Sequence, residues 1–135
     1  MKSATVLNYE IRPCKFAERR MLLASIARIM GVLKLKYQYI GFGGLSFTDF
    51  KLFHKELHIK DMYSIEAKYE PNKLEFNKPY SCINILHGQS SDQLSLVDLS
   101  KPSIVWLDYD NTLSMTFFTD IELVLREVPH GSIII

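Results

Sequence analysis

Two short motifs in this chain could together hold a nucleotide. Gly41-Phe42-Gly43-Gly44 follows one apolar run, and Glu66 closes a second, 22 residues after Gly44. Glycines allow positive φ and bring backbone N–H groups close to a ligand, whereas a carboxylate accepts hydrogen bonds from both hydroxyls of a ribose. An apolar run, a glycine turn, a helix and a second run ending in an acid are the order of a βαβ cofactor-binding unit. The spacing therefore predicts a nucleotide-cofactor site.

Polar residues also follow two later apolar runs. His87-Gly88-Gln89-Ser90 comes after one run and Asp108-Tyr109-Asp110 after the next. His87 is a candidate general base for a hydroxyl substrate, because imidazole titrates near neutral pH. If residues 108–110 stay extended, Asp108 and Asp110 lie about 6.6 Å apart on one face and could share a hard cation such as magnesium.

The elements that must position these residues alternate along the chain. Short runs rich in Ile, Val, Tyr and Leu predict five strands, over residues 37–41, 61–66, 81–86, 103–108 and 132–135. Apolar residues at helical spacing predict three helices, over residues 14–33, 47–57 and 116–128. Gly31 is expected to end the regular part of the first helix. The alternation predicts an α/β fold, a three-layer Rossmann-like sandwich whose mostly parallel sheet of about five strands has helices on both faces.

The predicted sheet gathers the polar residues at one edge. Gly41, Glu66, His87-Gly88 and Asp108 each lie at or just past the end of a predicted strand. Ligands of open parallel sheets bind above the carboxyl ends of the strands, where the strand order reverses. We therefore expect one site built from all four segments.

Composition limits the classes of protein. The chain has 135 residues, 47% of them hydrophobic and 23% charged, which is typical of one globular domain. Its net charge of +1 indicates neither nucleic acid nor an anionic membrane as partner. Cys14 and Cys82 are far apart and lack metal-site spacing, which favours free thiols in a reducing compartment. With no apolar run near 18 residues and no signal-peptide pattern, we expect a cytoplasmic protein.

With these positions laid out, residues 37–135 resemble the cofactor-binding core of a class I S-adenosylmethionine-dependent methyltransferase, preceded by an extension and helix over residues 1–36. The resemblance implies that Gly41-Phe42-Gly43-Gly44 packs against the methionine part of S-adenosylmethionine and that Glu66 holds the ribose hydroxyls. It also implies that Gly88-Gln89-Ser90 contacts the adenine, with the Gln89 amide in place of the acid usual in that family.

The fourth strand is similar to that of the catechol O-methyltransferase branch. This similarity implies that Asp108 is catalytic and that Asp108 and Asp110 bind magnesium. A magnesium ion would lower the pKa of a substrate hydroxyl and position its oxygen for attack on the sulfonium methyl group. The activity implied is O-methylation of a small molecule.

The chain departs from the family in two respects. Tyr39 and Ile40 occupy the end of the first strand, where the family usually has an acid. The full fold also has two further strands beyond the fifth, so we expect a truncated domain. An uncovered edge over residues 132–135 would be a pairing hazard, and we expect it to form a homodimer.

Other enzyme classes share parts of the pattern. Asp108-Tyr109-Asp110-Asn111-Thr112 matches the DxDxT signature of haloacid-dehalogenase-type phosphatases, but that fold needs a downstream lysine and no lysine follows Thr112. A dinucleotide-binding oxidoreductase would share the glycine loop and Glu66, but Ser46 stands where the third glycine of GxGxxG would be.

A non-catalytic scaffold is the alternative of a different class. In that interpretation the glycines only turn the chain, Glu66 is a solvated strand end, and Asp108 or Asp110 caps the following helix. The basic residues at and just before the start of the first helix also leave two interpretations open. Arg12, Lys15 and Arg19 could recognise an anionic substrate or simply cover the helix surface.

Overall fold

The computed structural model describes residues 12–110 and 112–135. Their helices are α1 (Pro13–Leu33), α2 (Thr48–Leu57), α3 (Pro71–Asn77), α4 (Ser90–Leu94) and α5 (Met115–Glu127). Their strands are β1 (Gln38–Gly41), β2 (Met62–Glu66), β3 (Ile83–His87), β4 (Ser103–Trp106) and β5 (Ile133–Ile134). The strands form one sheet in the order β3-β2-β1-β4-β5, and every described pair is parallel. The predicted parallel α/β sheet is confirmed.

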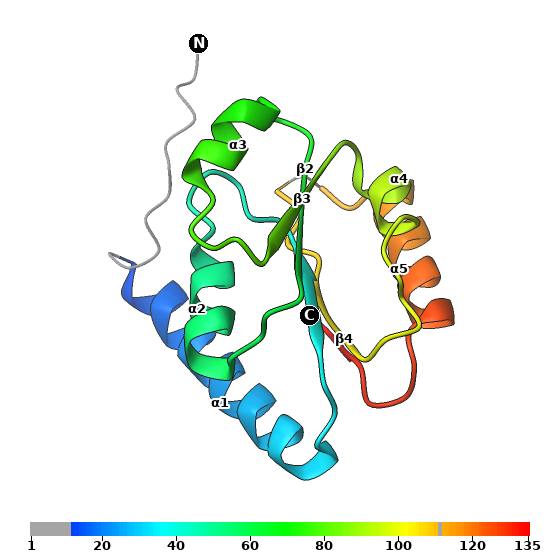
Figure 1. The fold of residues 1–135 in the computed structure, drawn as a ribbon. Coiled ribbons are helices and arrows are strands. Elements are labelled where there is room, and N and C mark those ends of the chain that lie inside the picture. Colours follow the sequence, from blue (N-terminus) through cyan, green and yellow to red (C-terminus); the bar gives the residue numbers. More distant parts are fainter. Residues whose placement is uncertain (1–11, 111) are drawn as a thin grey trace.

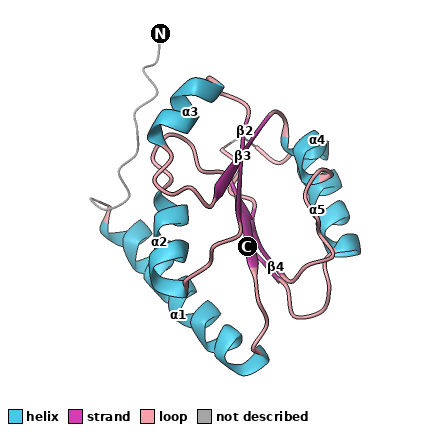
Figure 2. Cartoon of the chain, in the orientation of Figure 1, coloured by secondary structure: helices cyan, strands magenta, loops and turns pink. Residues whose placement is uncertain are grey.

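Helices cover both faces of this sheet. Helices α1, α2 and α3 lie on one side and α4 and α5 on the other, with the sheet seen nearly edge-on between them (Figures 1 and 2). The order of strands reverses between β1 and β4, because β1 leads outward to β2 and β3 while β4 leads to β5. The three-layer Rossmann-like arrangement is therefore confirmed, with its switch point between β1 and β4.

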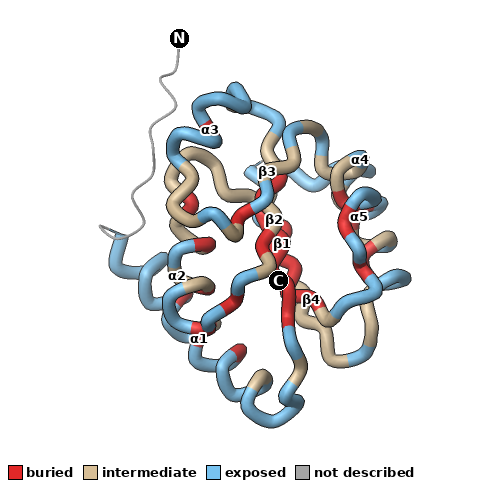
Figure 3. The backbone as a smooth tube through the Cα atoms, in the orientation of Figure 1, coloured by how far each residue is buried: buried red, intermediate tan, exposed pale blue. Residues whose placement is uncertain are grey.

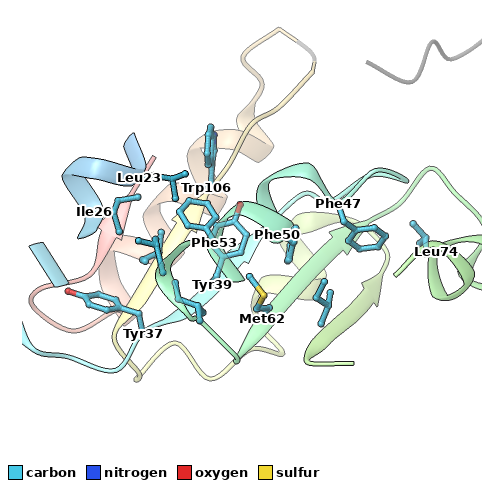
Figure 4. Packing of buried hydrophobic residues seen from close by; sticks show 14 residues of the cluster. Leu23, Ile26, Tyr37, Tyr39, Phe47, Phe50, Phe53, Met62, Leu74 and Trp106 are labelled. Carbon is cyan, nitrogen blue, oxygen red and sulfur yellow. The ribbon is translucent and has the colours of Figure 1, made fainter. Parts of the chain in front are cut away.

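Alternate residues of the central strands pack on opposite faces, as a period of two requires. On β1, Tyr39 joins the apolar cluster beneath α1 and α2, whereas Ile40 joins the cluster beneath α4 and α5. Buried residues run through the centre of the molecule (Figure 3). The first cluster is rich in aromatic rings, with Tyr39 between Phe50 and Phe53 at centroid distances of 4.8 and 4.3 Å (Figure 4). The sheet is thus packed against apolar helix faces on both sides.

Two features of the fold differ from expectation. Gly31 does not end the first helix, which continues to Leu33 and closes with Lys34 in the left-handed region at φ 53°. Nothing would contact a Cβ at Gly31, so this glycine lies on an open face and weakens the helix without breaking it. Helices α3 and α4 were not expected, because seven and five residues are too few to show a helical period.

Some expectations about the chain ends remain untested. Residues 1–11 of the expected extension, and Asn111 of the DxDxT match, lie outside the described residues. Strand β5 is an edge of the described sheet and pairs with β4, but the structure gives no support to the homodimer expected there. None of the described helices has the length and apolar character needed to cross a membrane.

Candidate functional site

A cavity of about 580 Å³ lies at the carboxyl ends of the strands. Segments after β1, β2, β3 and β4 all contribute to its wall. Its volume falls in the range of small-molecule sites, and its position is where parallel sheets bind ligands. Nine of the residues proposed from sequence line it: Phe42, Gly43, Gly44, Glu66, Gly88, Gln89, Ser90, Asp108 and Asp110. The topology thus brings four separate sequence segments to one cavity.

The glycine turn is shaped by close packing. A Cβ at Gly43 would lie 2.5 Å from Ser64 Oγ and 2.8 Å from Phe47 Cδ1, and Gly44 adopts φ +56°. The Gly43 N–H donates to Ser64 Oγ at 3.1 Å, which fixes the turn to β2. Both glycines are therefore required by the backbone path along the cavity.

Gly41 has a different reason to be a glycine. It is buried and is not part of the cavity lining, and a Cβ there would lie 2.7 Å from the Tyr39 hydroxyl. Tyr39 is only 1% exposed, and burial raises the pKa of its phenol well above the ordinary value. The residue that replaces the expected acid on β1 is thus part of the core.

Glu66 ends β2 at the cavity wall. Its Oε1 accepts a hydrogen bond of 2.7 Å from the Lys68 N–H, which turns the chain immediately after the strand. The carboxylate is half-buried and lines the cavity. A carboxylate has several acceptor positions, so the bond to Lys68 leaves capacity for ligand hydroxyls.

The segment after β3 divides into two parts. Gly88, Gln89 and Ser90 line the cavity and lead into α4. His87 is exposed and is absent from the lining, and its Nε2 lies 3.0 Å from the Tyr69 carbonyl oxygen. The structure thus separates the proposed base His87 from its cavity-lining neighbours.

The segment after β4 contributes two exposed carboxylates. Asp108 and Asp110 both line the cavity. Within residues 12–110 and 112–135, however, no three His, Cys, Asp or Glu side chains gather as a metal site would require. The expected magnesium site therefore finds no support in the arrangement of these side chains. The helix that follows begins after Ser114 without a side-chain cap, so neither aspartate caps it.

Three important side chains were missed from the sequence. Asp49 lines the cavity from α2, and its oxygens accept from Arg19 Nε at 2.5 Å and Arg19 Nη2 at 3.2 Å. Burial raises the pKa of Asp49, and the bond to Arg19 only partly opposes this effect. Neither of the two roles considered for Arg19 is observed. Its side chain is 3% exposed, lies outside the cavity lining and forms an ion pair with Asp49.

The other two are Tyr109 and Asp120. Tyr109 lines the cavity between Phe42 and Phe117, with ring centroids 5.1 and 5.2 Å away. Its hydroxyl donates to Oδ2 of Asp120, which is fully buried on α5. Burial, and then the bond to Asp120, raises the pKa of Tyr109 well above its ordinary value. Only the alternation of acids with apolar residues on α5 was visible in the sequence, and it predicts exposure for Asp120.

The lining carries an excess of negative charge. Among the described lining residues are one lysine, Lys68, and four carboxylates: Asp49, Glu66, Asp108 and Asp110. Because Arg19 compensates Asp49, three carboxylates and one ammonium group face the cavity. Such a wall favours a ligand with positive charge.

Comparison with protein families decides among the enzyme classes. Residues 7–135 match the family model described as "Putative O-methyltransferase". The chain belongs to this methyltransferase family. Comparison with curated proteins gave no match. The match covers almost the whole chain, including all four segments at the cavity.

The family and the fold agree. This methyltransferase is an enzyme that depends on S-adenosylmethionine, and its parallel sheet is that of the class I resemblance. The phosphatase and oxidoreductase alternatives receive no support from the comparison. The non-catalytic alternative receives no support from the comparison either. The family does not define the methyl acceptor.

Proposed function

We propose that the cavity above β1, β2, β3 and β4 binds S-adenosylmethionine and that its methyl group is transferred there to an oxygen of a small molecule. The observation that carries this proposal is the convergence of four segments on one cavity: the glycine turn, Glu66, Gly88-Gln89-Ser90 and Asp108. Each segment alone has an ordinary structural explanation. Their meeting at one cavity, in a chain of the methyltransferase family, favours a shared ligand.

The wall fits this cofactor chemically. S-adenosylmethionine carries a sulfonium and an ammonium group against one carboxylate, and the cavity wall carries more carboxylates than ammonium groups. Glu66 is suited to the ribose hydroxyls, because its carboxylate accepts hydrogen bonds and β2 fixes its position. Gly43 and Gly44 permit the backbone to approach the methionine part. Gly88, Gln89 and Ser90 are suited to the base.

The cofactor supplies an electrophilic methyl group on a positively charged sulfur. Transfer of this group to an acceptor oxygen would leave the electron pair of the carbon–sulfur bond on sulfur and would require the acceptor hydroxyl to lose its proton. We assign the role of proton acceptor to Asp108, which lines the cavity just past β4. His87 is not assigned this role, because it lies outside the lining.

The proposal departs from one expectation and leaves two others untested. The proposal gives Asp108 and Asp110 no metal, since the described side chains do not gather as a metal site. A cytoplasmic location remains a prediction, consistent with Cys14 and Cys82, which form no disulfide. The division into an extension over residues 1–36 and a core over residues 37–135 is likewise proposed rather than tested.

Titration calorimetry with S-adenosylmethionine and S-adenosylhomocysteine tests the proposal. Glu66→Gln keeps the shape and the acceptor for Lys68 but removes the charge, and should weaken binding by about tenfold to a hundredfold, the value of one or two charge-assisted hydrogen bonds. Glu70→Gln is the matched control, because Glu70 is exposed and lies outside the cavity.

Two further arms complete this experiment. Addition of magnesium should leave binding unchanged, whereas a magnesium-dependent gain that Asp110→Asn abolishes would restore the metal site. Absence of binding to the unmodified protein, or equal effects of Glu66→Gln and Glu70→Gln, would contradict the proposed function.

A further inference from the structure

A buried carboxylate on α5 lies behind the cavity wall. Asp120 is 0% exposed, and its Oδ2 accepts hydrogen bonds from Ser90 Oγ at 2.5 Å and from the Tyr109 hydroxyl. Ser90 and Tyr109 belong to different segments, after β3 and after β4, and both line the cavity. Asp120 therefore joins two parts of the wall that only the fold brings together.

The partners of Asp120 do not explain it as a stabilising residue. No positively charged side chain pairs with it among the described residues, and its buried Oδ1 has no hydrogen-bond partner among them. Burying a carboxylate against neutral hydroxyls is costly, and an unsatisfied buried oxygen adds to that cost. Such a residue calls for an explanation other than stability.

The hydrogen bonds to Asp120 fix the direction of two protons. A carboxylate only accepts, so both hydroxyls must donate to it. The raised pKa of Tyr109, caused by burial and the Asp120 bond, keeps the phenol protonated and therefore a donor. Each hydroxyl has spent its single proton, and only oxygen lone pairs remain for a ligand. The two hydroxyls therefore accept hydrogen bonds from a ligand and do not donate them.

We propose that Asp120 is a positioning residue that makes Ser90 and Tyr109 acceptors for the exocyclic amine of the adenine, and so selects a 6-aminopurine over a 6-oxopurine. The inference rests on the proposed function and assigns Tyr109 and Asp120 to the cofactor site. A carbonyl in place of the amine would set its lone pairs against those of the two hydroxyls. The edge contacts of Phe42 and Phe117 hold the Tyr109 ring for this contact.

The test compares two probes by titration calorimetry, S-adenosylhomocysteine and S-inosylhomocysteine, in which hypoxanthine replaces adenine. The unmodified protein should bind the adenine compound at least about tenfold more tightly than the hypoxanthine compound. A site that offers hydrogen-bond acceptors to an amine rejects an analogue that has a carbonyl acceptor in its place. In Asp120→Asn the side-chain amide can donate, which frees a hydroxyl proton to turn toward the cavity. The ratio of the two dissociation constants should then fall toward one.

The control is Glu122→Gln, on the same helix but exposed and outside the cavity lining, which should keep the unmodified ratio. A general loosening of the fold would weaken both probes alike and leave the ratio unchanged. If Asp120→Asn does not fold, Tyr109→Phe and Ser90→Ala provide the test, and each should lower the ratio severalfold.

The outcomes distinguish this inference from the proposed function. Binding of S-adenosylhomocysteine without discrimination against S-inosylhomocysteine would overturn the inference and leave the function standing. An unchanged ratio in folded Asp120→Asn, or in both single-hydroxyl variants, would also overturn it. If neither probe binds the unmodified protein, the function and the inference both fail.

Discussion

Asp49, which lines the cavity, and Asp120, which lies behind its wall, pack on opposite faces of the sheet and have different hydrogen-bond partners. Asp49 on α2 receives two hydrogen bonds from the guanidinium of Arg19, which also lies 5.1 Å from the ring centroid of Trp106. Asp120 on α5 receives only the hydroxyls of Ser90 and Tyr109. One carboxylate is compensated by charge and the other is not.

The difference separates a structural role from a functional one. The Arg19–Asp49 pair joins α1 to α2, and each charge has its counter-charge. Removing one partner of such a pair leaves an uncompensated charge inside the protein. The free energy of unfolding therefore falls strongly, even where the intact pair adds little net stability. Asp120 has no counter-charge among the described residues, but its hydrogen bonds orient two groups on the cavity wall. We expect the first site to govern stability and the second to govern ligand selection.

The largest expected effect is on stability at the first site. Arg19→Met keeps the apolar stem but leaves Asp49 without its counter-charge, and should lower the free energy of unfolding by about 3 kcal/mol. Urea denaturation measures this loss. Arg20→Met is the control, because Arg20 pairs with Glu56 at the surface and should cost less than about 1 kcal/mol. Equal losses of unfolding free energy in Arg19→Met and Arg20→Met would contradict the structural role given to the Arg19–Asp49 pair.

The loss of unfolding free energy in Arg19→Met should depend on pH. Burial raises the pKa of Asp49 above its ordinary 3.8, nearby Asp108 and Glu18 raise it further, and Arg19 opposes the rise. Without Arg19 the folded-state pKa is higher still, so the folded protein binds a proton more readily than the unfolded chain. The loss should therefore shrink as pH falls from 7 through that raised pKa toward 4. A loss that stays constant or grows on acidification would contradict this explanation.

The second site should show a smaller stability effect. Asp120→Asn preserves shape and one acceptor while removing a buried charge, so the free energy of unfolding should change by only about 1 kcal/mol. The same urea denaturation series measures it beside Arg19→Met. A loss of 3 kcal/mol or more would place Asp120 among the structural residues and make the two carboxylates alike.

The sequence predicted much of the fold because its strands and long helices have clear periods. On β1 the neighbours Tyr39 and Ile40 face opposite clusters, a pattern that buried strands require. The short helix α3 was missed because its seven residues show no helical period, and Pro71 in its first turn is then the only local sign of a helix start.

The site was predictable where residues are close in sequence to strand ends, and not elsewhere. Glu66 and Asp108 lie at the cavity because parallel strands end together. Asp49 and Asp120 lie on helices, where a charged residue type by itself predicts solvent exposure. Their roles depend on Arg19, Ser90 and Tyr109, distant in sequence, and on docking angles that no local pattern encodes.

A crystal structure with S-adenosylhomocysteine tests the central claim most directly. We predict that the ribose hydroxyls lie within hydrogen-bonding distance of the Glu66 carboxylate, with the adenine amine facing Ser90 and Tyr109. Density for the ligand elsewhere, or a ribose turned away from Glu66 in a fully occupied cavity, would contradict the account.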